Sequence, residues 1–139
     1  MKSKITLAFE KCKQEKRPAL ITYTVAGDNT KNNSLKILHA ISKHADILEL
    51  GMPFNAPVAD GGQIQGSSHR ALKNGITLKD VFQIVKKFKK ANSNKPIILM
   101  GYYNLIYQSG ENNFLENCKA AGVDGLIIVD LPYLSLIHI

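Results

Sequence analysis

Two carboxylates, Glu49 in an apolar run and Asp60 in the loop after it, are placed so that they could act as an acid and a base. Glu49 interrupts the apolar run Ile47-Leu48-Glu49-Leu50, and burying a carboxylate among apolar side chains is costly unless it is paired or protonated. Asp60 lies in the loop that follows, GMPFNAPVADGGQIQ, where prolines and glycines bend the chain. Two acids in different environments beside one pocket separate a proton donor from a proton acceptor. The pair is therefore our first candidate for catalysis.

Each acid also has a structural interpretation. Glu49 can serve as a carboxylate bonded to neighbouring backbone or to a cation, and Asp60 in Ala-Asp-Gly-Gly can form an Asx-turn. Other candidates are weaker. Tyr102, Tyr103 and Asp130 directly follow apolar runs. The histidines and the two cysteines, Cys12 and Cys118, lack the spacing of metal ligands or of a nucleophile motif, so we expect no metal.

The elements that must position these residues are short apolar runs alternating with longer helical patterns, which is typical of an α/β fold on a parallel sheet. The expected strands are 19–25, 47–50, 96–100 and 126–129. The last three are continuous apolar runs, which favours strands buried on both faces. The expected helices are 34–43, 63–73, one that begins after an N-cap at Thr77 with Asp80 at N3, and 111–121 ending at Gly122.

A weak internal repeat narrows the fold. The segments ADILELGMP (45–53) and VDGLIIVDLP (123–132) share an aspartate before a strand, an acid near its end and then a proline. Such repeated βα units fit a (β/α) barrel or a doubly wound sheet. No GxGxxG follows the first strand, which disfavours the dinucleotide-binding version. We therefore expect a barrel, with its active site at the carboxyl ends of the strands.

Composition limits the class of protein. The net charge of +7 in 139 residues suggests a nucleic-acid or anionic-membrane partner, but the basic residues concentrate in residues 1–17 and 79–95, where they fit solvated helix faces and one helix C-terminus. No apolar run is long enough for a signal peptide or a membrane span. We expect a cytoplasmic protein that binds neither nucleic acid nor membrane.

The stretch LELGMPFNAPVADGGQIQ (48–65) resembles the alpha chain of tryptophan synthase, whose pattern there is L-E-L-G-x-P-F-S-D-P-x-A-D-G-P-x-I-Q. Flanking segments agree: YTVAGD (23–28), MGYYN (100–104) and VDLP (129–132) are similar to the first, third and fourth strands and loops of that family. The resemblance covers roughly residues 16–133. It implies a (β/α)8 TIM barrel, truncated here to about its first four βα units.

The resemblance also implies a reaction. Members of the family are lyases of tryptophan biosynthesis that cleave indole-3-glycerol phosphate to indole and glyceraldehyde 3-phosphate and pass indole to a beta chain in an α2β2 tetramer. By residue-for-residue matching, Glu49 is the acid/base and Asp60 bonds the indole N–H. The substrate-binding positions along the indole pocket are Tyr23, Met100, Tyr102 and Val129. This half-reaction needs no cofactor, because the pyridoxal phosphate of the family belongs to the beta chain.

Some positions depart from the family pattern. Asn55-Ala56-Pro57 replaces Ser-Asp-Pro and loses a carboxylate in a loop that faces the beta chain. Gly62 stands where proline is usual, so we expect a more flexible Asp60 loop, and Asn29 replaces another usual proline. His44 stands at a helix end where glycine is usual, which predicts a mildly strained positive φ.

The length raises a separate point, because a complete TIM barrel takes about 250 residues. We expect residues 1–133 to be the amino-terminal half of the barrel, inactive and prone to aggregation on its own. Residues 134–139, LSLIHI, match one translation of a transposase adapter used in sequencing libraries, which favours a non-native tail. The open alternatives in function are another phosphate-handling TIM-barrel enzyme and a basic, non-enzymatic binding module.

Overall fold

The computed structural model describes residues 2–131, so the expected tail at 134–139 lies outside the described residues. The chain forms an α/β fold of four strands and six helices. In chain order these are α1 (Lys4–Gln14), β1 (Ile21–Val25), α2 (Lys31–Ile41), β2 (Ile47–Gly51), α3 (Gly62–Lys73), α4 (Leu78–Ala91), β3 (Ile97–Gly101), α5 (Tyr103–Ser109), α6 (Glu111–Ala121) and β4 (Gly125–Ile128).

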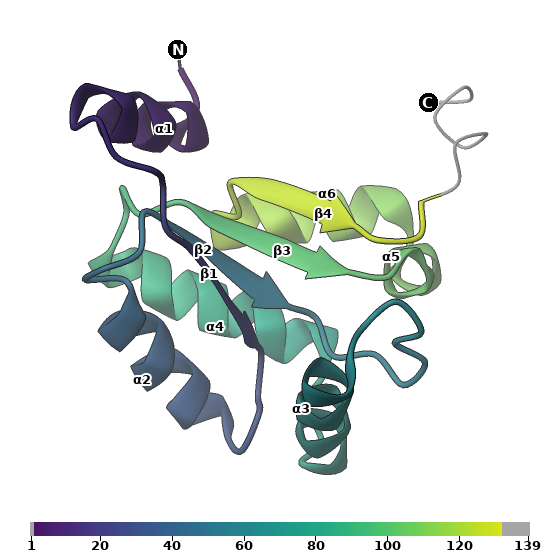
Figure 1. Cartoon of the computed structure of the whole chain (residues 1–139). Coiled ribbons are helices and arrows are strands. Elements are labelled where there is room, and N and C mark those ends of the chain that lie inside the picture. Colours follow the sequence, from purple (N-terminus) through teal and green to yellow (C-terminus); the bar gives the residue numbers. More distant parts are fainter. Residues whose placement is uncertain (1, 132–139) are drawn as a thin grey trace.

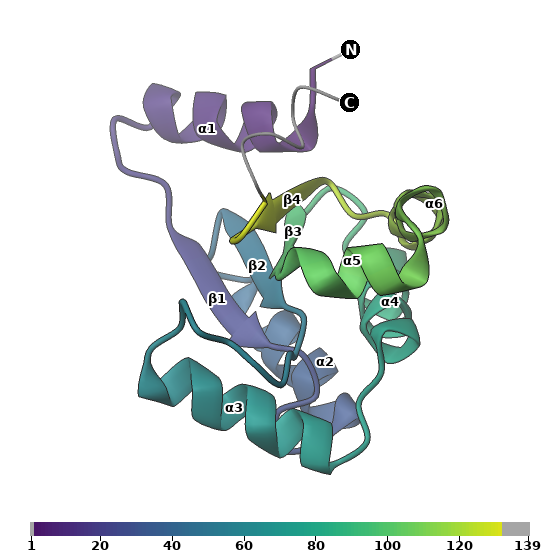
Figure 2. The same ribbon diagram turned by 90° about the vertical axis from the view of Figure 1, so that its right-hand side faces the viewer.

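The strands form one parallel sheet in the order β1-β2-β3-β4. Helices α2, α4 and α6 lie along one face of this sheet, α1 lies near its amino-terminal edge, and α3 and α5 lie near the carboxyl-terminal edge (Figures 1 and 2). We call the sheet face opposite α2, α4 and α6 the inner face. All four expected strands are confirmed to within two residues, and the βα alternation is that of a TIM barrel over its first units.

The core lies between the sheet and its covering helices. Alternate strand residues point to this side and are completely buried: Leu48, Leu50, Ile97 and Leu99. The inner face is less enclosed, since Ile98 and Met100 are half-buried and Ile127 is 42% exposed. The expectation that the apolar strands are buried on both faces is therefore wrong for β3 and β4. The inner side of β3 is only half-buried, and β4 is exposed on both faces, since Leu126 is 36% and Ile127 42% exposed.

The helix boundaries follow local signals where such signals exist. Thr77 and Asp80 form a reciprocal capping box that begins α4, and Gly122 takes a left-handed conformation (φ 86°) at the end of α6, as expected. The positive φ expected at His44 is wrong: within the described chain only Lys16 and Asn29 combine a side chain with positive φ. Helix α2 ends before His44, at Ile41, and its C-cap is Ser42, whose hydroxyl donates to the carbonyl of His39.

Some of the basic residues at 79–95 stabilise the fold. Lys89 and Lys90 fall in the last turn of α4, where positive charge complements the helix dipole. Lys89 is buried and donates to the Asp124 carboxylate at 2.6 Å. No helix of the described residues is long and apolar enough to cross a membrane.

Candidate active site

Glu49 lies on the inner face of β2, directly opposite Tyr23 of β1 in the strand register. Its side chain is half-buried, and burial raises the pKa of its carboxyl group above the usual range. Among residues 2–131, its carboxylate makes no hydrogen bond and no ion pair. The interpretation of Glu49 as a carboxylate tied to backbone or cation therefore finds no support. A carboxyl group with a raised pKa is suited to both accepting and donating a proton.

Asp60 is held by Tyr102, a residue 42 positions later in the chain. The Tyr102 hydroxyl donates to Oδ2 of Asp60 at 3.1 Å and accepts the backbone N–H of Ala59 at 3.0 Å. The Asp60 backbone N–H donates to the carbonyl of Pro57, which closes a turn. Among the described residues the Asp60 side chain accepts from Tyr102 and from no backbone N–H, so the Asx-turn interpretation is wrong.

Tyr23 completes this cluster from the neighbouring strand. Its hydroxyl lies directly over Gly51, so that a Cβ added at Gly51 would overlap it. Burial, followed by the negative charges of Asp60 and Glu49, raises the pKa of Tyr23 to about 12. Tyr23 therefore stays protonated at neutral pH and presents a hydrogen-bond donor beside two acids. The glycine of the Leu-Glu-Leu-Gly motif makes room for that hydroxyl, a role that sequence reasoning missed.

The two remaining expected pocket positions lie on the adjoining strands. Met100 is the register partner of Gly51 and of Ile127, which places it on the inner face. Val129 lies in the turn that follows β4 and donates its backbone N–H to the Gly101 carbonyl, which places it at the carboxyl-terminal edge of the sheet. All of the expected site residues thus come to the inner face or its carboxyl-terminal edge.

Tyr103 is not part of this cluster, whereas Asp130 lies beside Tyr102, whose pKa is raised by burial and also by the negative charges of Asp60 and Asp130. The Tyr103 hydroxyl donates to Glu111, and its backbone N–H donates to Oδ1 of Asp130 at 2.7 Å. Asp130 thereby caps the start of α5. Phe54, which the sequence did not single out, stacks on Tyr102 with ring centroids 5.1 Å apart. The sequence signal that could have indicated a role for Phe54 is its position as an aromatic residue between the two prolines of the loop.

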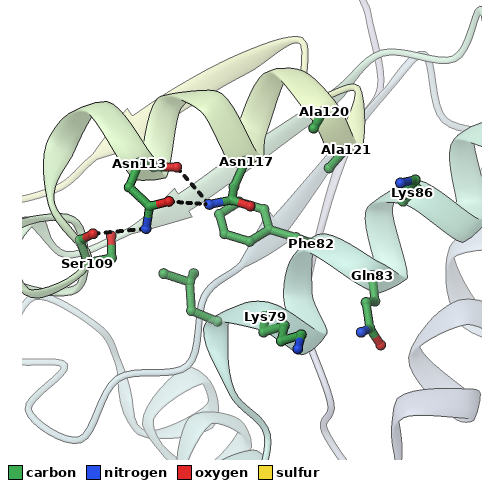
Figure 3. Close-up of a pocket in the computed structure, with 10 residues that line it drawn as sticks. Lys79, Phe82, Gln83, Lys86, Ser109, Asn113, Asn117, Ala120 and Ala121 are labelled. Atoms are coloured by element: carbon green, nitrogen blue, oxygen red, sulfur yellow. Dashed lines mark hydrogen bonds between the residues drawn. The ribbon is translucent and has the colours of Figure 1, made fainter.

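In the described part of the chain, no three His, Cys, Asp or Glu side chains are grouped to hold a metal ion. A partly apolar groove lies elsewhere. It is a groove of about 450 Å³ between α4 and α6, with Phe82 at its wall and Lys79, Lys86, Asn113 and Asn117 around it (Figure 3). This groove is on the opposite side of the sheet from Glu49 and contains no acid, so we place the chemistry at the inner face instead.

The sequence has a clear match among known families. Residues 9–137 match the model of the family described as tryptophan synthase alpha chain. The chain belongs to this family. A curated tryptophan synthase alpha chain from Pelagibacter ubique (strain HTCC1062) is 69% identical over 131 residues, which cover 94% of this chain and 49% of the relative. The resemblance carried by the 48–65 motif is confirmed.

Solved structures agree with the family. The alpha subunit from Legionella pneumophila str. Paris is 40% identical and superposes with a TM-score of 0.91 over 95% of this chain and 51% of its own. A structure concerning mutual activation of the tryptophan synthase a2b2 complex of Pyrococcus furiosus is 52% identical, with a TM-score of 0.79 over 82% of this chain and 48% of its own. The chain spans about half the length of these relatives. The family is one of lyases in tryptophan and amino-acid biosynthesis.

Proposed function

We propose that the full-length protein cleaves indole-3-glycerol phosphate to indole and glyceraldehyde 3-phosphate by a retro-aldol reaction. The observation that carries the proposal is the meeting of Glu49 and Asp60 beside Tyr23. Burial raises the pKa of Glu49, whereas Asp60 is held by a tyrosine hydroxyl. Two acids in such different surroundings suit the separate tasks of moving a proton and of stabilising a developing charge.

In this proposal Glu49 performs the proton transfers. Indole C3 gains a proton, and the ring becomes a cationic indolenine. The side-chain hydroxyl then loses its proton as the bond from C3 to the glycerol carbon breaks. The electron pair of that bond returns to the ring and restores indole, while the released fragment becomes the aldehyde of glyceraldehyde 3-phosphate. A carboxyl group whose pKa is raised by burial holds its proton more readily than an exposed one, which suits it to give a proton in the first step and take one in the second.

Asp60 stabilises the charge that develops during these transfers. Its carboxylate bonds the indole N–H, so it favours the positive ring of the intermediate over the neutral substrate. Tyr23, Met100, Tyr102 and Val129 lie on or beside the face that the indole ring would occupy. The mechanism uses proton transfers and charge stabilisation by side chains, and so calls for no metal or organic cofactor.

The proposal extends to a partner and a location. We expect the full-length protein to act in the cytoplasm and to pass indole to a tryptophan synthase beta chain in an α2β2 assembly, the kind of complex described for the Pyrococcus furiosus relative. Ala56 lies in the exposed part of the loop before Asp60. Because the family pattern has a carboxylate there, we expect weaker activation by the beta chain than in relatives that keep it. The 139-residue chain alone should be inactive.

The test is indole formation by the purified full-length protein. Glu49→Gln removes the titrating proton while keeping the size of the side chain, and should lower kcat at least 100-fold. Glu116→Gln, an exposed position on α6, is the matched control and should retain the parent rate. If Glu49→Gln formed indole at the parent rate, the assigned acid/base role would be wrong. If the parent formed no indole but turned over another phosphorylated substrate, the alternative of a different phosphate-handling barrel would replace this proposal.

A further inference from the structure

Tyr102 contacts the loop between β2 and α3 at two separate places. Its ring stacks on Phe54 near the start of the loop, with an interplanar angle of 27°. Its hydroxyl lies at the other end, where it accepts from the Ala59 N–H and donates to the Asp60 carboxylate. The side chain is only 3% exposed, so these contacts are made inside the protein. Tyr102 thus contacts the loop both at Phe54 and at Asp60.

We infer that Tyr102 is the positioning residue of Asp60, acting through that carboxylate rather than mainly as a wall of the ligand pocket. The inference rests on the proposed function. The Asp60 backbone is bonded to Pro57 and, through its carbonyl, to the Gln65 side chain at 2.8 Å, but among the described residues its carboxylate is bonded by the Tyr102 hydroxyl alone. A hydroxyl that holds a backbone N–H and the adjacent carboxylate fixes both the place and the direction of the acid.

The protonation state of Tyr102 supports this role. Burial is the largest effect on the hydroxyl and raises its pKa above the ordinary value, and the neighbouring Asp60 carboxylate acts in the same direction. The hydroxyl is therefore neutral at physiological pH and remains a donor to Asp60. Its lone pair remains free to accept from Ala59, so the two bonds are compatible at once.

Tyr102→Phe tests the inference in the full-length protein. It keeps the buried ring and the stacking on Phe54 but removes both bonds of the hydroxyl. We expect kcat for indole formation to fall about tenfold with KM changed less than threefold, because the misplaced carboxylate matters most in the charged transition state. Tyr103→Phe is the matched control: it removes the neighbouring hydroxyl, which bonds Glu111, and should leave kcat unchanged.

A double-mutant cycle separates positioning from general stability. If Tyr102 acts through Asp60, adding Tyr102→Phe to Asp60→Asn should change kcat less than twofold. An equal tenfold fall in both backgrounds, or no fall in the parent background, would overturn the inference. Full activity of Asp60→Asn by itself would instead overturn the proposed function, so the two failures are distinguishable.

Discussion

Asp46 and Asp124 make the same backbone bonds two strands apart. Each aspartate stands just before a strand, β2 or β4, and its carboxylate accepts the backbone N–H at or just before the start of the preceding strand: Leu20 to Asp46 at 2.8 Å and Ile97 to Asp124 at 2.9 Å. Each also donates its own backbone N–H to the carbonyl of that same partner. The aspartate of the internal repeat thus hydrogen-bonds the amino-terminal ends of neighbouring parallel strands to each other.

The two aspartates differ in their cations. Asp46 is bound by the Arg17 guanidinium through two bonds of 2.7 and 2.8 Å, and this partner holds the pKa of Asp46 well below its usual range. Arg17 is 39% exposed, whereas Lys89, the partner of Asp124, is 9% exposed. Solvent therefore screens the first pair more than the second.

Asp124→Asn should accordingly destabilise the full-length protein more than Asp46→Asn. Asparagine keeps an acceptor for the strand N–H but leaves Lys89 buried without its counter-charge, at a cost of roughly 3 kcal/mol. Urea unfolding at pH 7 checks the order. Because the folded pKa of Asp46 is depressed, its contribution is present above the ordinary carboxyl pKa and is lost as pH falls below it. The Asp46→Asn deficit should therefore shrink in acid, and an undiminished deficit at pH 2 to 3 would contradict the ion-pair explanation.

Glu49→Gln should have opposite effects on activity and on stability. The folded pKa of Glu49 is raised by burial, so its ionised form opposes folding once the pH exceeds the ordinary glutamate pKa, and this penalty is absent below that pH. The variant should melt at a higher temperature than the parent at pH 8 and at the same temperature at pH 3 to 4. Thermal melts followed by circular dichroism at both pH values give the comparison. A lower melting temperature at pH 8 would show that the carboxylate stabilises the fold.

Introducing proline at Gly62 and at Asn29, where the family usually has proline, should change the stability of the fold in opposite directions. Gly62 is the first residue of α3, Gly61 before it is extended (φ −75°, ψ 165°), and nothing blocks a side chain. Gly62→Pro should therefore stabilise by about 0.4 to 1 kcal/mol. Asn29 has φ 70°, which proline cannot adopt, so Asn29→Pro should destabilise by more than about 1 kcal/mol. Denaturant unfolding of both variants tests this, and equal effects would contradict the backbone explanation.

The missed helix α5 shows what sequence reasoning could not reach. The helix has only seven residues, starts immediately after β3 at Tyr103, and has no side-chain cap of its own. Its first N–H is satisfied by Asp130, 27 residues later. By contrast, the start of α4 was predictable because both members of its capping box, Thr77 and Asp80, are neighbours in the chain.

The sequence by itself determined the βα alternation, the family and the identity of the two acids. Apolar strand runs, amphipathic helix patterns and a long motif each consist of residues that are close together in the chain. Only the tertiary structure decided what surrounds those acids. Tyr102 reaches Asp60 across 42 positions, and Tyr23 lies over Gly51 from another strand. A loop rich in proline and glycine admits many conformations, and the one observed is set by side chains that strand pairing brings to it from distant parts of the chain.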